Sequence, residues 1–224
     1  MAQPIDECSI VPVCVIGSQF VTPDTIQIIV DTNSQGNIVV TDNNHRIMLK
    51  VKPCDTRFHR QRLLLHADDT PIAMLRSKLM TEHKRWKVYK GDSKTNSDMI
   101  FSTKAAHPFQ IKNRSHIHVF MANKIKERLG DFLIKGSWSK RNCTISKRDS
   151  SIMIASMDTM DVPENVRFVK DKFKLKVCAN VDYAFIVALI AIVDAIKRYT
   201  LTNQMVELAT DSVIEAALGG FGPS

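Results

Sequence analysis

The chain has 224 residues, of which 44% are hydrophobic and 24% are charged, an ordinary composition for a globular protein. This composition excludes a largely disordered, collagenous or coiled-coil chain, and the length allows one large all-β domain or two small domains. The chain has 31 Lys and Arg residues against 23 Asp and Glu residues, so its formal net charge is +8, which suits a partner that carries phosphates, such as nucleic acid or anionic lipid.

Residues 1–10 lack the basic start and the apolar stretch of a secretory signal, and we expect them to be flexible. The five cysteines form no Cys-x-x-Cys pair, and their odd number fits a disulfide framework poorly. Reduced thiols, in the cytoplasm or the nucleus, are the simplest interpretation.

Between residues 14 and 177 one pattern recurs, in which two short β-prone runs flank a turn rich in Asp, Asn or Gly. This pattern is typical of β-hairpins. The predicted hairpins span 38–51, 62–75 and 142–155, and further strands are predicted at 85–89, 99–103, 117–121, 132–135 and 173–177. In the last of these strands apolar and basic residues alternate, so one face should be buried and the other should be solvent-exposed and positively charged.

The pattern changes at Tyr183, where eleven residues without a polar break run to Val193. They predict about three turns of helix, with Asp182 as its N-cap or as an acid in its first turn, and with Lys197 and Arg198 suited to its C-terminus. The segment is too short to cross a bilayer, which takes roughly 20 apolar residues. It is also apolar on every face, so it cannot lie half exposed on a surface.

A helix that has no polar face must be surrounded by other parts of the protein or by a partner. A closed β-sheet wrapped around the helix satisfies this requirement, and closure also removes unpaired strand edges. The sequence therefore predicts a mainly β protein, in which a closed antiparallel barrel surrounds one central hydrophobic helix at about 181–198. The alternative is a helix packed between a sheet and a partner chain. Residues 200–224 should form a tail, with a short helix and then a flexible end.

Several segments resemble the plant LURP-one-related family, in order and at matching spacing from about residue 11 to residue 198. They are 17–20 (GSQF), 37–42 (NIVVTD), 83–93 (HKRWKVYKGDS), 136–145 (GSWSKRNCTI) and 180–189 (NVDYAFIVAL). The resemblance implies one domain at 11–199 with a tubby-like fold, a β-barrel of about twelve strands threaded by one hydrophobic C-terminal helix. This fold is shared with tubby proteins and phospholipid scramblases.

The resemblance also implies a function. Tubby domains tether to the plasma membrane through phosphatidylinositol bisphosphate, and LURP-one-related proteins are associated with plant defence. We therefore expect a non-enzymatic protein that binds anionic phospholipid, in particular a phosphoinositide, as a membrane-tethered signalling or transcription-linked factor. Its expected location is the cytoplasm, peripheral at the plasma membrane, with the nucleus as the alternative.

The candidate lipid contacts lie in two basic clusters. On a strand, Arg85, Lys87 and Tyr89 would share one face, while Trp86 and Val88 would share the other. Arg forms paired hydrogen bonds with phosphate oxygens and Lys adds point charge, although a solvated outer barrel face would show the same alternation. The candidate residues are Lys84, Arg85, Lys87, Lys90, Lys135, Lys140 and Arg141.

The other motifs are less informative. His116 and His118 would lie on one face of a strand, but no carboxylate or cysteine stands at ligand spacing, so we expect no metal. The sequence shows no phosphate-binding loop, dinucleotide fingerprint or Gly-x-Ser-x-Gly motif, so we expect no cofactor and no enzymatic activity. The main alternative function is a protein-interaction adaptor in defence signalling. Nucleic-acid binding is a weaker alternative, because no helix-turn-helix, zinc-finger or basic-zipper pattern is visible.

Overall fold

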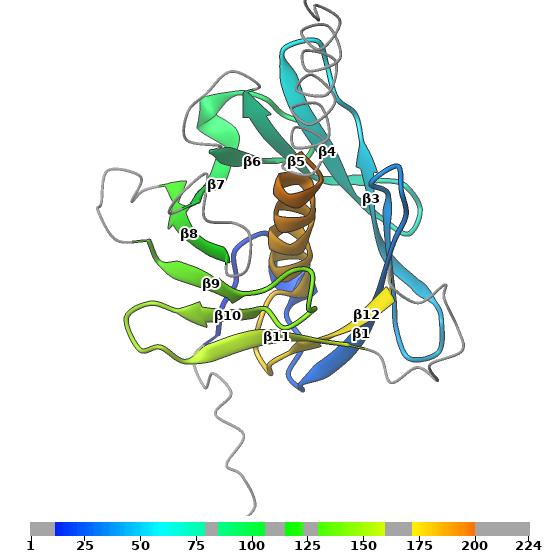
Figure 1. Cartoon of the computed structure of the whole chain (residues 1–224), viewed down its shortest axis with the longest axis vertical. Coiled ribbons are helices and arrows are strands. Elements are labelled where there is room, and N and C mark those ends of the chain that lie inside the picture. Colours follow the sequence, from blue (N-terminus) through cyan, green and yellow to red (C-terminus); the bar gives the residue numbers. More distant parts are fainter. Residues whose placement is uncertain (1–11, 79–84, 106–114, 123–129, 160–171, 200–224) are drawn as a thin grey trace, which may run out of the picture.

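The computed structural model describes residues 12–78, 85–105, 115–122, 130–159 and 172–199. Within these residues, twelve strands close into one antiparallel barrel in which chain neighbours pair and β1 pairs with β12. A single helix, described over residues 183–199, runs through the barrel (Figure 1). The barrel and its helix confirm the predicted fold class.

All of the predicted strands are present, with small shifts at their ends. The strands are β1 (Ile26–Thr32), β2 (Ile38–Thr41), β3 (Ile47–Pro53), β4 (His59–His66), β5 (Pro71–Lys78), β6 (Trp86–Lys90), β7 (Met99–Ala105), β8 (Ser115–Met121), β9 (Phe132–Gly136), β10 (Thr144–Lys147), β11 (Met153–Thr159) and β12 (Lys172–Val177). The alternation predicted for the last strand is confirmed, because Phe173, Leu175 and Val177 are buried and the lysines between them are not.

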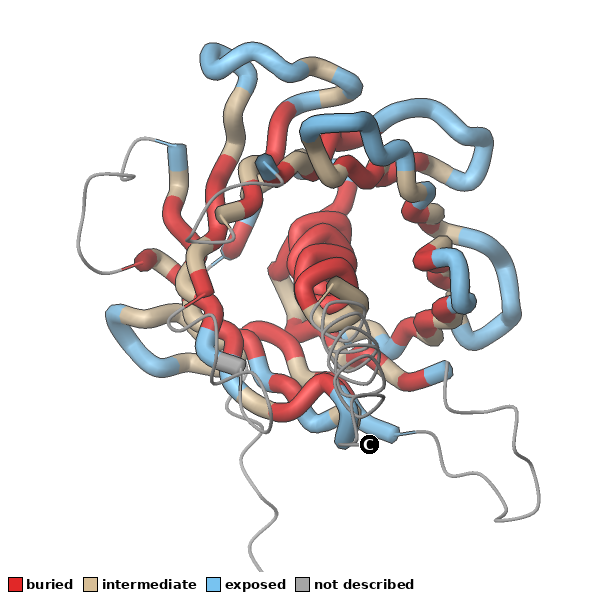
Figure 2. Tube along the Cα trace, turned by 45° about the horizontal axis from the view of Figure 1, so that its top comes forward, coloured by how far each residue is buried: buried red, intermediate tan, exposed pale blue. Residues whose placement is uncertain are grey.

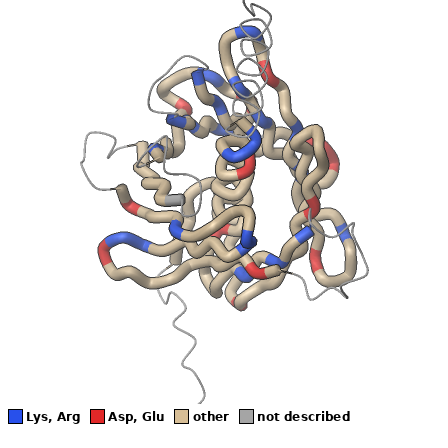
Figure 3. The backbone as a smooth tube through the Cα atoms, in the orientation of Figure 1, with Lys and Arg blue, Asp and Glu red and all other residues tan. Residues whose placement is uncertain are grey.

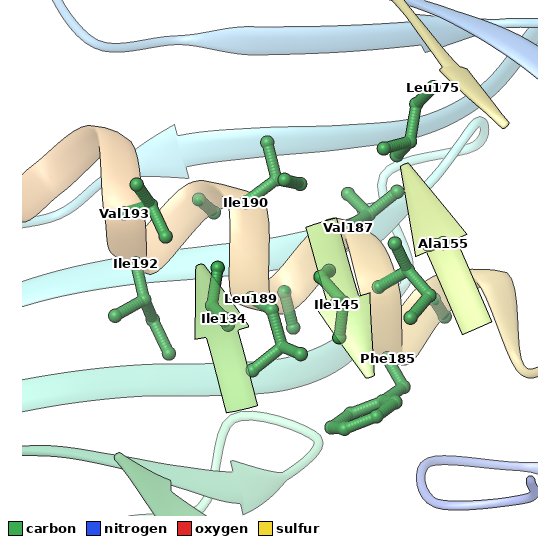
Figure 4. Close-up of a cluster of buried hydrophobic side chains, with 14 of the residues drawn as sticks. Ile134, Ile145, Ala155, Leu175, Phe185, Val187, Leu189, Ile190, Ile192 and Val193 are labelled. Carbon is green, nitrogen blue, oxygen red and sulfur yellow. The ribbon is translucent and has the colours of Figure 1, made fainter. Parts of the chain in front are cut away.

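The helix is enclosed on all sides. Every residue from 184 to 196 is at most 6% exposed, and Figure 2 shows this buried stretch inside the ring of strands. In Figure 4 the side chains of Ile134, Ile145 and Leu175, which come from three different strands, lie around the helix. The barrel itself therefore supplies the enclosure that the apolar run requires, and a partner chain is not needed for it.

Asp182 begins the helix and ties the N-terminal segment to it. Its Oδ1 accepts the N–H of Phe185 at 2.9 Å, which confirms the predicted N-cap. Its Oδ2 accepts the N–H groups of Val15, Ile16 and Gly17 at 3.2, 2.7 and 3.1 Å. The buried carboxylate thus satisfies backbone donors from both segments, which would otherwise remain unpaired.

A second buried carboxylate joins the other end of the helix to the barrel wall. Arg62 of β4 points inward, and its Nη1 donates to Asp194 Oδ2 at 2.9 Å and to the carbonyl of Ala191 at 3.0 Å. Arg198 donates to the same Asp194 oxygen through Nε at 2.7 Å. Burial lowers the pKa of Arg62, and the adjacent Asp194 counteracts that decrease. The ion pair compensates charges that would be costly to bury alone.

Two features differ from the sequence expectations. The sequence pattern did not single out β1, which pairs with β12 and closes the barrel. Cys178 takes part in a disulfide bond, so the expectation of reduced thiols is wrong for this residue, whereas Cys14, Cys54 and Cys143 are free. The predicted flexible start at 1–10 and the tail at 200–224 lie outside the described residues. Among the residues that are described, no helix is long and apolar enough to span a membrane.

Candidate anion-binding site

A hollow of about 590 Å³ lies on the outside of the barrel, and we call it the cationic hollow. Six of the nine residues that line it are Lys or Arg, and none of these nine is Asp or Glu. They come from the start of β4, from β5, β6 and β7, and from the loop 91–98. The lining residues are His59, Arg76, Lys78, Arg85, Lys87, Tyr89, Lys94, Asn96 and Lys104.

Strand alternation and register bring these side chains together. Trp86 and Val88 of β6 are buried in the core, so Arg85 and Lys87 face outward, as the sequence predicts. Arg76 of β5 stands opposite Lys87 in the antiparallel register. In Figure 3 several Lys and Arg positions lie close together at the upper part of the barrel, around β5 to β7.

The loop 91–98 contributes Lys94 and Asn96 to the hollow. Lys87 Nζ donates to Asn96 Oδ1 at 3.3 Å, so the loop contacts the strand that carries the central lysine. Asp98 of this loop accepts hydrogen bonds from the hydroxyls of Ser93 and Thr95, at 2.5 and 2.8 Å. These two bonds lower the pKa of Asp98 and direct its carboxylate to the loop itself. The hollow therefore keeps its positive lining.

His59 is held as a neutral imidazole at the edge of the hollow. Its Nδ1 lies 3.2 Å from Arg76 Nη2, and a guanidinium can only donate, so Nδ1 accepts and the ring proton is on Nε2. Burial lowers the pKa of His59, and the positive charges of Arg76, Lys78 and Lys94 lower it further. Three cations therefore act on this edge of the hollow.

The first predicted basic cluster contributes to the hollow in part. Arg85 and Lys87 line it, and the Arg85 guanidinium lies 5.7 Å from the centre of the Phe120 ring, which helps to position it. Lys90 is exposed at the end of β6 and does not line the hollow. Lys84 lies outside the described residues.

The second predicted cluster is not part of the hollow. Lys135 on β9 and Lys140 in the following turn are exposed, and β7 and β8 separate their strand from β6. Arg141 packs against the rings of Trp138 and Phe173, with its guanidinium carbon 4.4 and 4.6 Å from the ring centres. The convergence of basic residues therefore takes place around β5 to β7.

Sequence reasoning missed six residues of the hollow, because strand pairing and the loop 91–98 bring them together from separate elements. The missed residues are His59, Arg76, Lys78, Lys94, Asn96 and Lys104. One signal was available in β5, where Arg76 and Lys78 alternate with the buried Leu75 and Ser77. Such alternation places both cations on the outside, but it does not show which strands lie beside them.

Two other features are weaker candidates. A second hollow of about 600 Å³ has both acidic and basic lining residues, including Asp131, Asp149 and Lys147, so it has no single charge preference. His118 Nδ1 lies 3.2 Å from Arg148 Nη1, where the guanidinium must donate to it. The described residues contain no group of three His, Cys, Asp or Glu side chains placed to hold a metal ion.

The comparisons with known proteins agree with this architecture. The chain is 35% identical to Protein LURP-one-related 15 of Arabidopsis thaliana, over 74% of this chain and 75% of that protein. It is 31% identical to Protein LURP1 of the same plant, over 87% and 95% of the two chains. An X-ray structure of a protein from Arabidopsis thaliana, 30% identical, covers 82% of this chain and 98% of its own, with a TM-score of 0.65. A family model described as LURP-one-related matches residues 27–194, and the chain therefore belongs to the LURP-one-related family.

Proposed function

We propose that this protein is a non-enzymatic module that binds the phosphorylated headgroup of an anionic phospholipid, in particular a phosphoinositide, in the cationic hollow. The observation that supports this most directly is the set of six Lys and Arg side chains around one hollow without a lining carboxylate. Like charges gathered in this way repel one another, and a bound polyanion would relieve that repulsion. A ligand with several phosphates is the best match to so many cations.

The chemistry of the lining suits phosphate more than a single carboxylate. Arg76 and Arg85 can each form two parallel hydrogen bonds with phosphate oxygens, whereas the lysines contribute mobile point charges. Tyr89 and Asn96 add neutral polar groups that can bind the hydroxyls of a sugar or inositol ring. The hollow thus combines strong anion attraction with a few groups that could select among headgroups.

The family context supports a binding role rather than catalysis. The relatives named above do not carry the names of enzymes. The resemblance to membrane-tethered tubby domains favours a peripheral position at the cytoplasmic face of the plasma membrane. As part of the same proposal, the protein acts in plant defence signalling, with the nucleus as a second location.

Vesicle sedimentation tests the proposal. We expect the protein to pellet with vesicles that contain phosphatidylinositol bisphosphate and not with neutral phosphatidylcholine vesicles. The double variant Lys78→Gln/Lys87→Gln should bind roughly thirtyfold more weakly, since each basic residue near the surface contributes about 1 kcal/mol.

The matched control is Lys135→Gln/Lys140→Gln, which removes the same net charge outside the hollow and should bind nearly like the wild type. Equal pelleting with neutral and phosphoinositide vesicles would contradict the proposal. A protein that pellets with neither vesicle would support the adaptor function instead.

A further inference from the structure

The turn between β3 and β4 exposes an aromatic side chain directly beside the cationic hollow. Phe58 is 69% exposed, and the next residue, His59, lines the hollow. Among the described residues, Ile47 is the other exposed large hydrophobic residue, at 45%. Single exposed apolar residues are common on protein surfaces. The surroundings of Phe58 therefore decide what its exposure means.

The turn that carries Phe58 is pinned to the strand that follows it. The N–H of Thr56 donates to the carbonyl of His59 at 2.8 Å, and the N–H of His59 donates back at 3.4 Å. Asp55 Oδ1 accepts the N–H of Gln61 at 2.7 Å. These bonds fix the backbone on both sides of Phe58. The ring is thus presented on an ordered turn, which lowers the entropic cost of binding through it.

Apart from Asp55, whose Oδ1 accepts the N–H of Gln61, the charged side chains around this turn are positive. The Arg57 guanidinium carbon lies 5.8 Å from the centre of the Phe58 ring. Arg60 follows on β4, and Lys78 is the register partner of His59. An apolar ring between cations matches the interface of an anionic bilayer, where acyl chains lie directly below negative headgroups.

The turn also defines which end of the barrel would face a membrane. The Arg60 guanidinium packs on the ring of Tyr199 at 3.7 Å, so β4 begins near residue 199 of the central helix. Ile47 starts β3 and Pro53 ends it, so Ile47 lies about 20 Å from the Phe58 end of that strand. Phe58 and the edge of the cationic hollow at His59 therefore share one end of the barrel, and Ile47 lies at the other.

We propose that Phe58 inserts into the interface of an anionic bilayer while the cationic hollow holds a phosphorylated headgroup of the same bilayer. The inference rests on the proposed function of the hollow and adds a second, apolar contact with the same membrane, made by Phe58. It also sets the orientation, with the Phe58 end of the barrel toward the membrane. Apolar burial and electrostatic attraction then add in one binding event.

Two ligands that share a headgroup test the inference. Binding of wild type, Phe58→Ala and Ile47→Ala is measured with vesicles containing phosphatidylinositol bisphosphate and with soluble inositol trisphosphate. We expect Phe58→Ala to weaken vesicle binding about tenfold, because one phenyl ring no longer leaves water, and to leave binding of the soluble headgroup unchanged. Ile47→Ala, at the opposite end, should bind both ligands like the wild type.

The results separate the two proposals. If Phe58→Ala binds the vesicles as well as the wild type does, insertion is wrong, while the headgroup site stands as long as the soluble ligand binds. If Phe58→Ala weakens both ligands equally, the ring acts on the hollow rather than on the bilayer, and the insertion is again overturned. If the wild type binds neither ligand, the proposed function itself fails.

Discussion

At the start of the central helix, Asp182 accepts four backbone N–H groups from segments that lie about 165 residues apart. Asp182→Asn would keep one acceptor oxygen but would turn an amide NH₂ group toward donors that it cannot satisfy. We expect the variant to lose about 2–4 kcal/mol of unfolding free energy, from the weakened cap and the unpaired buried N–H groups. Urea unfolding monitored by circular dichroism measures the loss.

The control for this prediction is Asp24→Asn, which changes an exposed aspartate and should alter the unfolding free energy by less than about 0.5 kcal/mol. A loss below 1 kcal/mol for Asp182→Asn would show that the barrel and the N-terminal segment hold together without this carboxylate.

His59 predicts a pH dependence of headgroup binding. Burial and the charges of Arg76, Lys78 and Lys94 lower its pKa, so the free protein holds it neutral at pH 7. A bound polyanion would offset those charges and raise the pKa again, so the complex would take up a proton. Because the complex then binds more protons than the free protein, the contribution of His59 to affinity should grow as the pH falls from 7.5 to 5.5.

The measurement compares wild type with His59→Gln, because phosphate groups titrate in the same pH range and affect both proteins alike. We expect the ratio of their vesicle affinities to rise several-fold toward pH 5.5. A ratio that stays constant would show that the ligand does not change the electrostatic potential at His59.

Among the elements, the helix and most strands could be predicted because local sequence determines their burial. The apolar run from Tyr183 to Val193 is stable in water only when the rest of the protein encloses it completely. In β12, apolar and basic residues alternate, so the sequence itself shows which face is buried. β1 escaped prediction because Ile26, Ile28, Ile29 and Val30 place apolar residues on both faces. Its role as the closing strand depends on pairing with β12, which no local pattern contains.

Replacing a large side chain of the buried helix by a smaller one should destabilise the protein. Leu189 is fully buried and lies near Ile134 and Ile145 of two barrel strands (Figure 4). We expect Leu189→Ala to cost about 2–5 kcal/mol in the free energy of unfolding, since the closed barrel can collapse only partly onto the cavity. Urea unfolding provides the measurement.

Ile47→Ala serves as the comparison for Leu189→Ala, because the side chain of Ile47 is 45% exposed, and it should cost much less. A similar cost at both positions would mean that the helix is packed less tightly than its burial indicates.

For the whole molecule, the net charge of +8 indicated an anionic partner but could not locate the site. Alternation in the sequence placed two residues of the hollow, Arg85 and Lys87, on the outer face of the barrel. The remaining cations reach the hollow through strand register and through a loop that contacts the outer face, both of which are set by tertiary structure. The same topology left Lys135 and Lys140 outside it. The sequence therefore shows how many basic residues the protein has, but only the fold shows which of them lie together around the hollow.

This difference between total charge and local charge leads to a prediction about salt. Raising NaCl from 0.1 to 1 M shortens the Debye length from about 10 to about 3 Å, so exposed charge attractions weaken. We expect wild type and Lys135→Gln/Lys140→Gln to lose vesicle affinity steeply with salt, and Lys78→Gln/Lys87→Gln to start weaker and decline less. Each double variant removes two positive charges from the same net charge of +8. Parallel salt curves for the two doubles would therefore mean that overall charge, and not the cationic hollow, attracts the membrane.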